Sequence, residues 1–536
     1  MGQRSGCGRA GQGRMAALRR SGAARGVASA AALGVSLGGC GAASGVHDFF
    51  LGGGSGATQQ ALTGFIGGAA ADEPQAALAA RAVLAQGGTA ADAAVALAFT
   101  LSVTLPSRAS LGAGGACVAY QPRESGAGGG VPQAIMFTPI APAAPGAGAD
   151  RPAAVPMMAR GMFLLHALYG SRPFESLVAP AEQLARFGTP VSRAFAQDLA
   201  EVGGPLLADP NARAVFGAGG AAAVAADGVA DGAAGGVAAR ARPGRRGAVG
   251  AGAGGGLAAA GGGGATLAEG AVMTQPALGA TLAQLRVAGV GDFYQGGLAA
   301  KLVHGAAVAG GGLAATDLRT ALPHAVAPLV VAAGTDQVAF VPEPADGGVA
   351  AAAGFQALLR SPEDMAGAQA RAVAAAAAVR AGADAKAALA GGGGGAALPA
   401  LPASTSFVVI DRHGEAVACA LTMDNLFGTG RVAAGTGVLL AASPALARPM
   451  LAAAVEWNAN LHAFRAAAGG SGQEGAALAV AAGLEDARRS GRAMAAPVPE
   501  PGRANVASCA RYLPGTEESC HVATDPRGAG LAVGSE

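Results

Sequence analysis

The sequence has little net charge and few aromatic residues. Its 536 residues include 36 Lys and Arg and 34 Asp and Glu, and the resulting charge of +2 leaves no electrostatic footprint for nucleic acid. Aromatic residues make up only 4% of the chain, whereas there are 90 Gly and 30 Pro. Apolar burial must therefore rest on many small side chains. The length suits one large domain or two closely packed ones.

Signatures of metal and phosphate binding are also missing. The seven histidines show no ligand spacing, and neither Cys-x-x-Cys nor His-Glu-x-x-His occurs, so we expect no metal site and no cofactor. The Gly-rich run at 112–115 lacks the Lys of a P-loop and the strand–Gly–helix context of a dinucleotide site. This Gly-rich run is therefore only weak support for phosphate binding.

The first forty residues predict an exported protein with a lipid anchor. From Met15 the chain reads a basic stretch, an apolar run over 26–37 and then Leu37-Gly38-Gly39-Cys40. This order is typical of a secretory signal, and the run is too short to span a bilayer. The ending resembles a bacterial lipobox, so we predict that Cys40 carries a lipid and holds the protein at the membrane, on the periplasmic side of the cell envelope. The alternative is an apolar helix start that happens to contain a cysteine.

Four of the six cysteines lie beyond Cys40. Cys117 and Cys419 lie in apolar runs, where we expect buried free thiols. Cys509 and Cys520 flank a loop that contains Pro and Gly. If the protein is exported, we predict that a disulfide closes this loop.

Beyond residue 40 we expect a spacer and two regions. A Gly-rich spacer occupies 41–70, a first region 71–403 and a second region, with a C-terminal tail, 404–536. Within the first region, residues 217–264 consist mainly of Gly and Ala with a few Arg, and we expect no regular structure there.

Helix and strand signals are clearest at two places. Asp72 as a cap and the Gly pair at 87–88 bracket one helix, and a second helix is expected over 89–103. Farther along, apolar runs at 407–410 and 416–421 flank a turn that ends in Gly and predict a hairpin.

Five blocks in the same order resemble the gamma-glutamyltranspeptidase family. They lie at 73–96, 112–120, 169–192, 275–318 and 404–440. The first contains Gln-Gly-Gly-Thr-Ala-Ala-Asp-Ala-Ala-Val-Ala and the last begins Ser-Thr-Ser-Phe-Val-Val-Ile-Asp. The resemblance implies an α+β fold, a four-layer αββα sandwich of the N-terminal nucleophile (Ntn) hydrolase type. It also implies a hydrolase or acyltransferase for a small amide or peptide, with gamma-glutamyl compounds as the family's substrates. Such an enzyme becomes active after cutting itself into a large and a small fragment.

The resemblance places the catalytic nucleophile at Ser404, where the family has Thr. A hydroxyl is a weak nucleophile until a base takes its proton, and a freed α-amine with a pKa of about 8 can be that base. The same hydroxyl would first attack the Ala403 carbonyl, and hydrolysis of the resulting ester would expose the amine. Two alternatives stay open: Thr405 is the nucleophile, or both residues are ordinary hydroxyls at a strand entry.

Further site residues follow from the same resemblance. Thr422 matches a second Thr that bonds the nucleophile, and Gly469-Gly470 match a pair whose N–H groups form the oxyanion hole. Asp424 stands where the family has an Asn that helps to hold the glutamyl head group. Thr405 is a further candidate for contact with substrate.

The residues that hold the glutamyl group in the family are replaced. The anchoring Arg falls at Thr138, the acidic residue at Leu446 and the paired serines at Leu451-Ala452. A pocket without both complementary charges should bind a glutamyl head group poorly, although Arg431 or Arg465 could supply a cation. Two functions therefore stay open: an envelope amidohydrolase or acyltransferase, or a non-catalytic lipoprotein that uses the fold as a binding or scaffold module.

Overall fold

The computed structural model describes six stretches of the chain. They are residues 64–122, 130–144, 149–219, 264–390, 404–445 and 450–534. The predictions for Cys40, for most of the spacer and for most of the 217–264 insertion lie outside these residues, as do Ala403 and Leu446.

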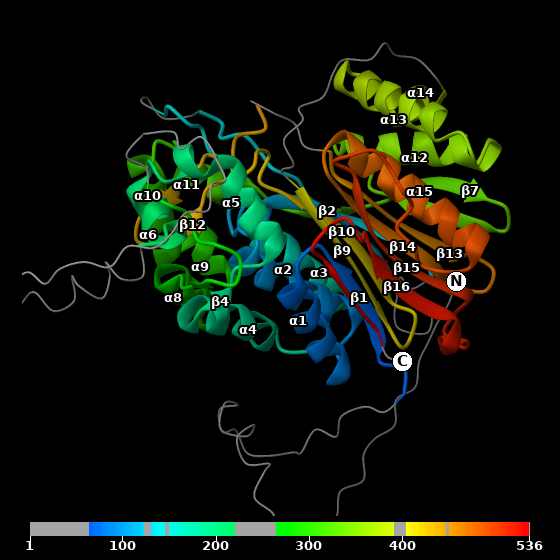
Figure 1. The fold of residues 1–536 in the computed structure, drawn as a ribbon, viewed down its shortest axis with the longest axis horizontal. Helices are drawn as coiled ribbons and strands as arrows, with labels where there is room; N and C mark the ends of the chain where they lie inside the picture. Colours follow the sequence, from blue (N-terminus) through cyan, green and yellow to red (C-terminus); the bar gives the residue numbers. More distant parts are fainter. Residues whose placement is uncertain are drawn as a thin grey trace, which may run out of the picture. The chain divides into compact units, whose positions relative to one another are not determined.

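One sheet has seven antiparallel strands in the order β17-β1-β9-β10-β2-β3-β6 (Figure 1). The strands are β1 (Gly67–Ala71), β2 (Gly114–Tyr120), β3 (Gln133–Phe137), β6 (His324–Val326), β9 (Ser404–Asp411), β10 (Ala416–Thr422) and β17 (Leu531–Gly534). The expected hairpin is confirmed, because β9 and β10 pair directly.

The second sheet has six antiparallel strands in the order β16-β15-β14-β13-β8-β7. The strands are β7 (Leu329–Ala333), β8 (Asp336–Phe340), β13 (Ala452–Asn458), β14 (Ala463–Ser471), β15 (Arg503–Leu513) and β16 (Cys520–Thr524). Two small sheets pair β4 (Thr189–Pro190) with β5 (Val272–Met273) and β11 (Val432–Ala433) with β12 (Val438–Leu439). Each large sheet combines strands from before and after residue 404.

Helices cover the outer faces of both large sheets (Figure 1). On the side of the seven-stranded sheet they are α1 (Pro74–Ala85), α2 (Ala90–Thr104), α3 (Met158–Tyr169), α4 (Phe174–Phe187), α5 (Arg193–Leu206), α6 (Pro210–Phe216), α8 (Pro276–Ala288), α9 (Val290–Gln295), α10 (Gly297–Val308) and α11 (Ala315–Thr320). On the other side are α12 (Asp346–Arg360), α13 (Met365–Arg380), α14 (Ala385–Ala390) and α15 (Glu474–Ser490), and a short 3-10 turn, η2 (Glu517–Ser519), precedes β16. The layers are those of the expected αββα sandwich. No helix in the described ranges is both long and apolar enough to cross a bilayer.

The sequence predicted the start of α2 to within one residue but indicated the wrong capping residue for α1. Thr89 caps α2 in a capping box with Asp92, so the expected helix is present, shifted by one residue at each end. The prediction that Asp72 caps α1 is wrong, because the Glu73 carboxylate accepts the Ala76 N–H at 2.8 Å instead. Both acids precede Pro74, and the pattern alone did not separate them. The Asp72 carboxylate instead accepts hydrogen bonds from residues at the start of β9.

Side chains on β9 alternate between two cores. Phe407 and Val409 pack beneath the helices, whereas Val408 and Ile410 face the second sheet, because successive strand residues point to opposite sides. Small residues such as Ala453 fill much of the space between the sheets, as the composition predicts.

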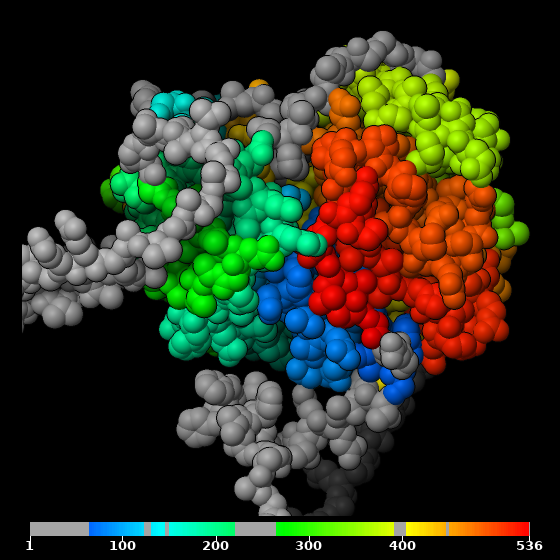
Figure 2. Space-filling model, in the orientation of Figure 1, coloured from blue at the N-terminus to red at the C-terminus, as the bar shows by residue number. Residues whose placement is uncertain are grey.

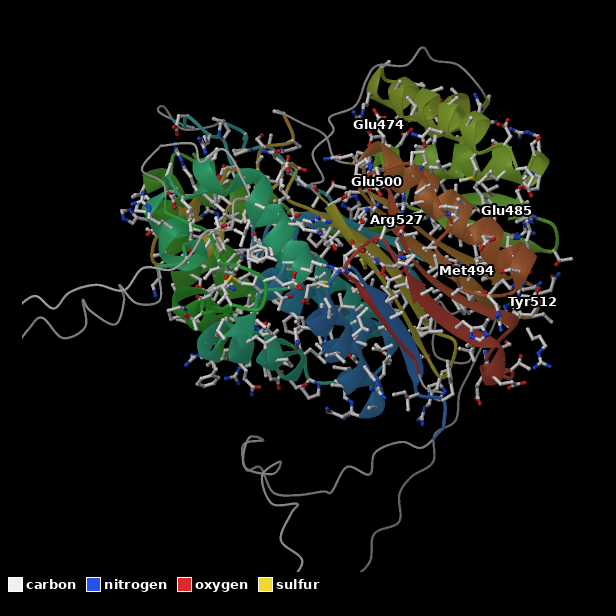
Figure 3. All side chains as sticks on the ribbon, in the orientation of Figure 1. Glu474, Glu485, Met494, Glu500, Tyr512 and Arg527 are labelled. Atoms are coloured by element: carbon white, nitrogen blue, oxygen red, sulfur yellow. A yellow bond between two sulfur atoms is a disulfide. The ribbon has the colours of Figure 1, made fainter. Side chains whose placement is uncertain are left out.

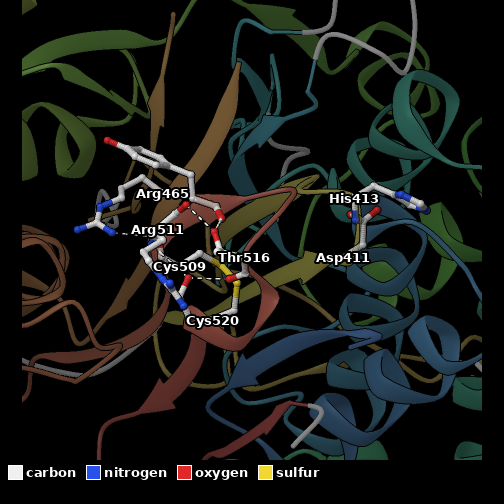
Figure 4. The surroundings of a disulfide bond; sticks show 9 residues. Asp411, His413, Arg465, Cys509, Arg511, Thr516 and Cys520 are labelled. Atoms are coloured by element: carbon white, nitrogen blue, oxygen red, sulfur yellow. Dashed lines mark hydrogen bonds between the residues drawn. A yellow bond between two sulfur atoms is a disulfide. The ribbon is translucent and has the colours of Figure 1, made fainter. Parts of the chain in front are cut away.

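The structure joins Cys117 to Cys419 and Cys509 to Cys520. The second pair is the expected one, and it bridges β15 and β16 (Figure 4). The expectation of free thiols at Cys117 and Cys419 is wrong. These residues lie directly opposite one another on β2 and β10, and the sequence did not show that these strands are neighbours.

Candidate active site

Ser404 and Thr422 lie side by side on the inner face of the seven-stranded sheet. Ser404 opens β9 and is directly opposite Thr422, the last residue of β10. Both are buried, with exposed fractions of 1% and 0%. By strand alternation, both side chains are on the face that carries Val408 and Ala418 and packs against the second sheet. The hairpin thus brings together two hydroxyls that the sequence separates by a turn.

A backbone amide from the second sheet reaches the Ser404 hydroxyl. The N–H of Gly472 donates to Ser404 Oγ at 3.3 Å. Gly472 lies between β14 and α15 with a φ of 93°, and a Cβ there would collide with the Pro501 carbonyl. The next residue, Gln473, also has a positive φ, 54°, before the 17-residue helix α15 begins.

This turn leads directly into α15, which begins two residues after Gly472. The first N–H groups of a helix have no intrahelical acceptor and carry a partial positive charge. Such a terminus stabilises an anion in front of it. An oxyanion that forms beside the Ser404 hydroxyl would therefore meet the Gly472 N–H, which lies two residues before this helix.

The structure does not place Gly469 and Gly470, the expected oxyanion donors, at the Ser404 hydroxyl. Both lie within β14, between β13 and β15. Each residue of a strand with two antiparallel neighbours directs its N–H into the ladder, so these amides are committed to the sheet. Gly469 instead permits close packing, because a Cβ there would lie 3.0 Å from the Ser406 Cβ. The Gly-Ser-Gly run at 470–472 was the available sequence signal for the nearby amide.

Asp72 holds the start of β9 in place. Its carboxylate accepts the Thr405 hydroxyl at 3.0 Å and the Ser406 N–H at 3.1 Å. Asn505 of β15 donates to Asp72 at 2.8 Å and to the Ser406 carbonyl at 2.9 Å. Thr405 points to the face opposite Ser404 and is engaged by Asp72, so the geometry favours Ser404 over Thr405 as nucleophile. It assigns no substrate contact to Thr405.

Asp424 is a buried carboxylate whose oxygens have no hydrogen-bond partner among the described residues. It is 3% exposed and has a φ of 62°, and its N–H donates to Thr422 Oγ1 at 2.9 Å. Burial raises the pKa of this carboxyl well above its ordinary value. An unsatisfied buried polar group is costly, so these oxygens lower the stability of the fold unless a hydrogen-bond donor reaches them.

The two arginines considered as replacement anchors are engaged elsewhere. Arg431 forms an ion pair with Asp150 at 2.6 Å and donates to the Ala309 carbonyl at 2.7 Å. Arg465 donates to the Cys509 carbonyl at 3.0 Å, beside the second disulfide (Figure 4). Among the described residues, no group of three or more His, Cys, Asp or Glu could hold a metal ion.

A charged cleft of about 250 Å³ adjoins the site through Asp72 and Pro501. Its charged lining comprises Arg108, Arg503, Arg527, Asp72, Asp198, Glu201, Glu500 and Asp525. The three guanidiniums are already paired with Asp198, Glu500 and Asp525, at 2.6, 2.7 and 2.7 Å. Figure 3 labels two of these residues, Glu500 and Arg527. Each of the three arginines that line the cleft within the described part of the chain is therefore already paired and unavailable to a substrate carboxylate.

In fold, the chain is similar to several solved structures. It resembles the cephalosporin acylase from Bacillus halodurans, with 16% identity and a TM-score of 0.62 over 90% of this chain and 98% of that one. It also resembles LmbA2991HD, with 19% identity and a TM-score of 0.62 over 89% and 100%. For the gamma-glutamyltranspeptidase of Helicobacter pylori the identity is 22% and the TM-score 0.44, over 58% of this chain and 83% of that one.

The comparisons by sequence give one match. No curated protein matches the chain. The family model of gamma-glutamyltranspeptidase matches residues 76–231 and 259–385, more than half of the chain, and ends before Ser404. The similarity in fold to the cephalosporin acylase covers 90% of this chain and so extends across the second region as well. The chain therefore belongs to the gamma-glutamyltranspeptidase family, whose members are hydrolases and acyltransferases of amides.

Proposed function

We propose that this protein is an N-terminal nucleophile amidohydrolase or acyltransferase that cuts its own chain before Ser404. The observation that carries the proposal is the position of the Ser404 hydroxyl. It lies opposite Thr422 and accepts the Gly472 N–H at the start of α15. A nucleophile, a neighbouring hydroxyl and an oxyanion donor thus converge from β9, β10 and the β14–α15 turn.

Self-cleavage would proceed by an N-to-O acyl shift. Ser404 Oγ attacks the Ala403 carbonyl carbon, the C–N bond breaks and the hydroxyl proton passes to the departing nitrogen. Water then hydrolyses the ester, which leaves a carboxylate on Ala403 and a free hydroxyl and amine on Ser404. The contacts of Asp72 with Thr405 and Ser406 support this step, because they hold the attacking residue's strand in place.

The freed amine would then serve as the base for substrate. With a pKa of about 8, it can accept the Ser404 Oγ proton as the oxygen attacks a substrate amide. The Gly472 N–H and the positive end of α15 are suited to stabilise the tetrahedral oxyanion, and one such donor is typically worth about 10²–10³ in rate. The leaving amine takes the proton, and water or a second amine releases the acyl group from Ser404.

We further propose that this enzyme does not bind the acyl group of its substrate through the α-carboxylate contacts that the family makes with a glutamyl group. Thr138 and Leu451 occupy positions where the family holds that group, and Arg431 and Arg465 are engaged elsewhere. The unpartnered Asp424 carboxylate favours a head group that presents a hydrogen-bond donor or a cation.

Export and lipid attachment at Cys40 belong to the same proposal. The lipobox-like Leu37-Gly38-Gly39-Cys40 supports it, and so do two disulfides, which persist in oxidising compartments such as the periplasm. Labelling expressing cells with a radioactive fatty acid should mark the wild type and not Cys40→Ala. Equal labelling of both proteins would place the lipid elsewhere.

The decisive experiment is reducing gel electrophoresis of the purified chain, with N-terminal sequencing of the smaller band. We expect a fragment that begins at Ser404, its loss in Ser404→Ala, its retention in Ser404→Thr and little change in Thr405→Ala. A gamma-glutamyl anilide should release aniline slowly or not at all, even from the cleaved protein. An intact wild-type chain would favour the rival function, a non-catalytic lipoprotein, to which the replaced anchors also point.

A further inference from the structure

Cys117 and Cys419 lie on opposite sides of the proposed cleavage position. They are 302 residues apart in the sequence, and their Cα atoms lie 4.1 Å apart across β2 and β10. Cys117 precedes residue 404 and Cys419 follows it, so this disulfide joins the two regions. The other disulfide, between Cys509 and Cys520, lies entirely within the second region.

The two regions are interleaved around this bond. In the seven-stranded sheet, β9 and β10 are flanked by β1 and β2, which both precede residue 404. At the sheet's edge, β17 pairs with β1, and in Figure 2 red residues from late in the chain lie against blue residues from early in its described part. Neither region alone contains a complete large sheet.

The bond is also shielded from solvent. Cys117 and Cys419 are both 0% exposed and lie on the face of the sheet that packs beneath α2. The α2 helix is itself buried along its whole length. Because the described residues bury both cysteines completely, a dissolved reductant should reach the sulfur atoms only slowly while the fold is intact.

We propose that the Cys117–Cys419 disulfide keeps the large and small fragments in one covalent molecule after self-cleavage. This inference rests on the proposed function, because only a cut before Ser404 creates two fragments. The cleaved enzyme then cannot lose its nucleophile-bearing fragment by dissociation, even when it unfolds transiently. The tether also keeps the fragments at a high effective concentration for refolding, which two free chains would lack. Splitting it takes two electrons and two protons from an added reductant and yields two thiols.

The test compares gels of the purified, alkylated wild-type protein with and without tris(2-carboxyethyl)phosphine. We expect one band at the full mass without reductant and two fragments with it. The double variant Cys117→Ser, Cys419→Ser should give two fragments in both lanes. The matched control Cys509→Ser, Cys520→Ser should behave as the wild type, because its bond lies within one fragment. Separation of the wild-type fragments without reductant would overturn the inference.

Two further measurements separate this inference from the proposed function. Peptide mapping of non-reduced protein should find the peptides of Cys117 and Cys419 linked, whether or not the chain is cleaved. Linked peptides in a chain that stays whole under reduction would refute self-cleavage, and with it the tether between fragments, while leaving the disulfide established. Cleaved protein with free thiols at both positions would refute the tether alone. Reductant added to native protein should release less than a tenth of the small fragment that it releases in urea, and equal release would contradict the shielding.

Discussion

Glu456 should make the stability of this protein fall as pH rises. The residue lies in β13, is 0% exposed and faces α15, where Arg488 contacts one of its oxygens at 2.9 Å. The other oxygen has no hydrogen-bond partner among the described residues. Burial raises the pKa of Glu456 to about 8, and the nearby Arg488 offsets this only in part. We predict that Glu456→Gln removes this pH dependence while keeping the shape of the side chain.

The sign follows from the two pKa values. The folded-state value, about 8, exceeds the ordinary 4.5 expected for the unfolded chain. Between these pH values the folded protein holds a proton that the unfolded chain has lost, so stability is greatest below pH 4.5 and falls as pH rises toward 8. Since each pKa unit corresponds to about 1.4 kcal/mol, the full difference is about 5 kcal/mol. We expect about 2–4 kcal/mol of it between pH 5 and pH 9.

Urea unfolding at pH 5, 7 and 9, followed by tryptophan fluorescence, measures this difference. The single tryptophan of the chain is Trp457, adjacent to Glu456 and 3% exposed, so it reports on this part of the sheet. All variants carry Ser404→Ala to keep the chain whole. Glu363→Gln is the matched control, because Glu363 pairs with Arg489 at the surface and is largely exposed. If Glu456→Gln instead loses stability relative to its parent as pH rises, the ion pair with Arg488 dominates and the reasoning is refuted.

Four other changes test the site and the tether. Thr422→Val should slow self-cleavage about tenfold, the equivalent of one hydrogen bond, and a time course on gels would show it; an unchanged rate would remove Thr422 from the reaction. Gly472→Ala should cost about 1–3 kcal/mol in denaturant unfolding and suppress cleavage, because φ is 93° and the new Cβ meets Pro501; normal cleavage would exclude this amide as a donor. Asp424→Asn should leave the free energy of unfolding unchanged near pH 4 and raise it at pH 8, because burial raises the folded-state pKa of Asp424 above its unfolded value. Urea titrations of both proteins at both pH values measure this, and an equal change of stability with pH in the two proteins would contradict it. Removing the Cys117–Cys419 bond from the uncleavable chain should cost about 3–5 kcal/mol, whereas an unchanged denaturation midpoint would show that the bond does not constrain the unfolded chain.

The sequence alone predicted the features that depend on neighbours along the chain. Apolar runs at 407–410 and 416–421 on either side of a turn indicated the β9–β10 hairpin, and the hairpin by itself placed Thr422 near Ser404. Thr89 and its neighbours indicated α2. The ordered family blocks implied the αββα layers, because a shared order of motifs reflects a shared chain path.

Only the tertiary structure decided which distant segments meet. The sequence predicted that the amides of Gly469 and Gly470 reach Ser404, whereas the structure shows the Gly472 N–H bonded to it. Strand pairing commits the N–H groups of Gly469 and Gly470 to the sheet. The tertiary structure also gave Asp72 its role at β9 and joined Cys117 to Cys419. Periodicity reports which face a residue occupies, but the neighbour across that face is chosen by packing between segments hundreds of residues apart.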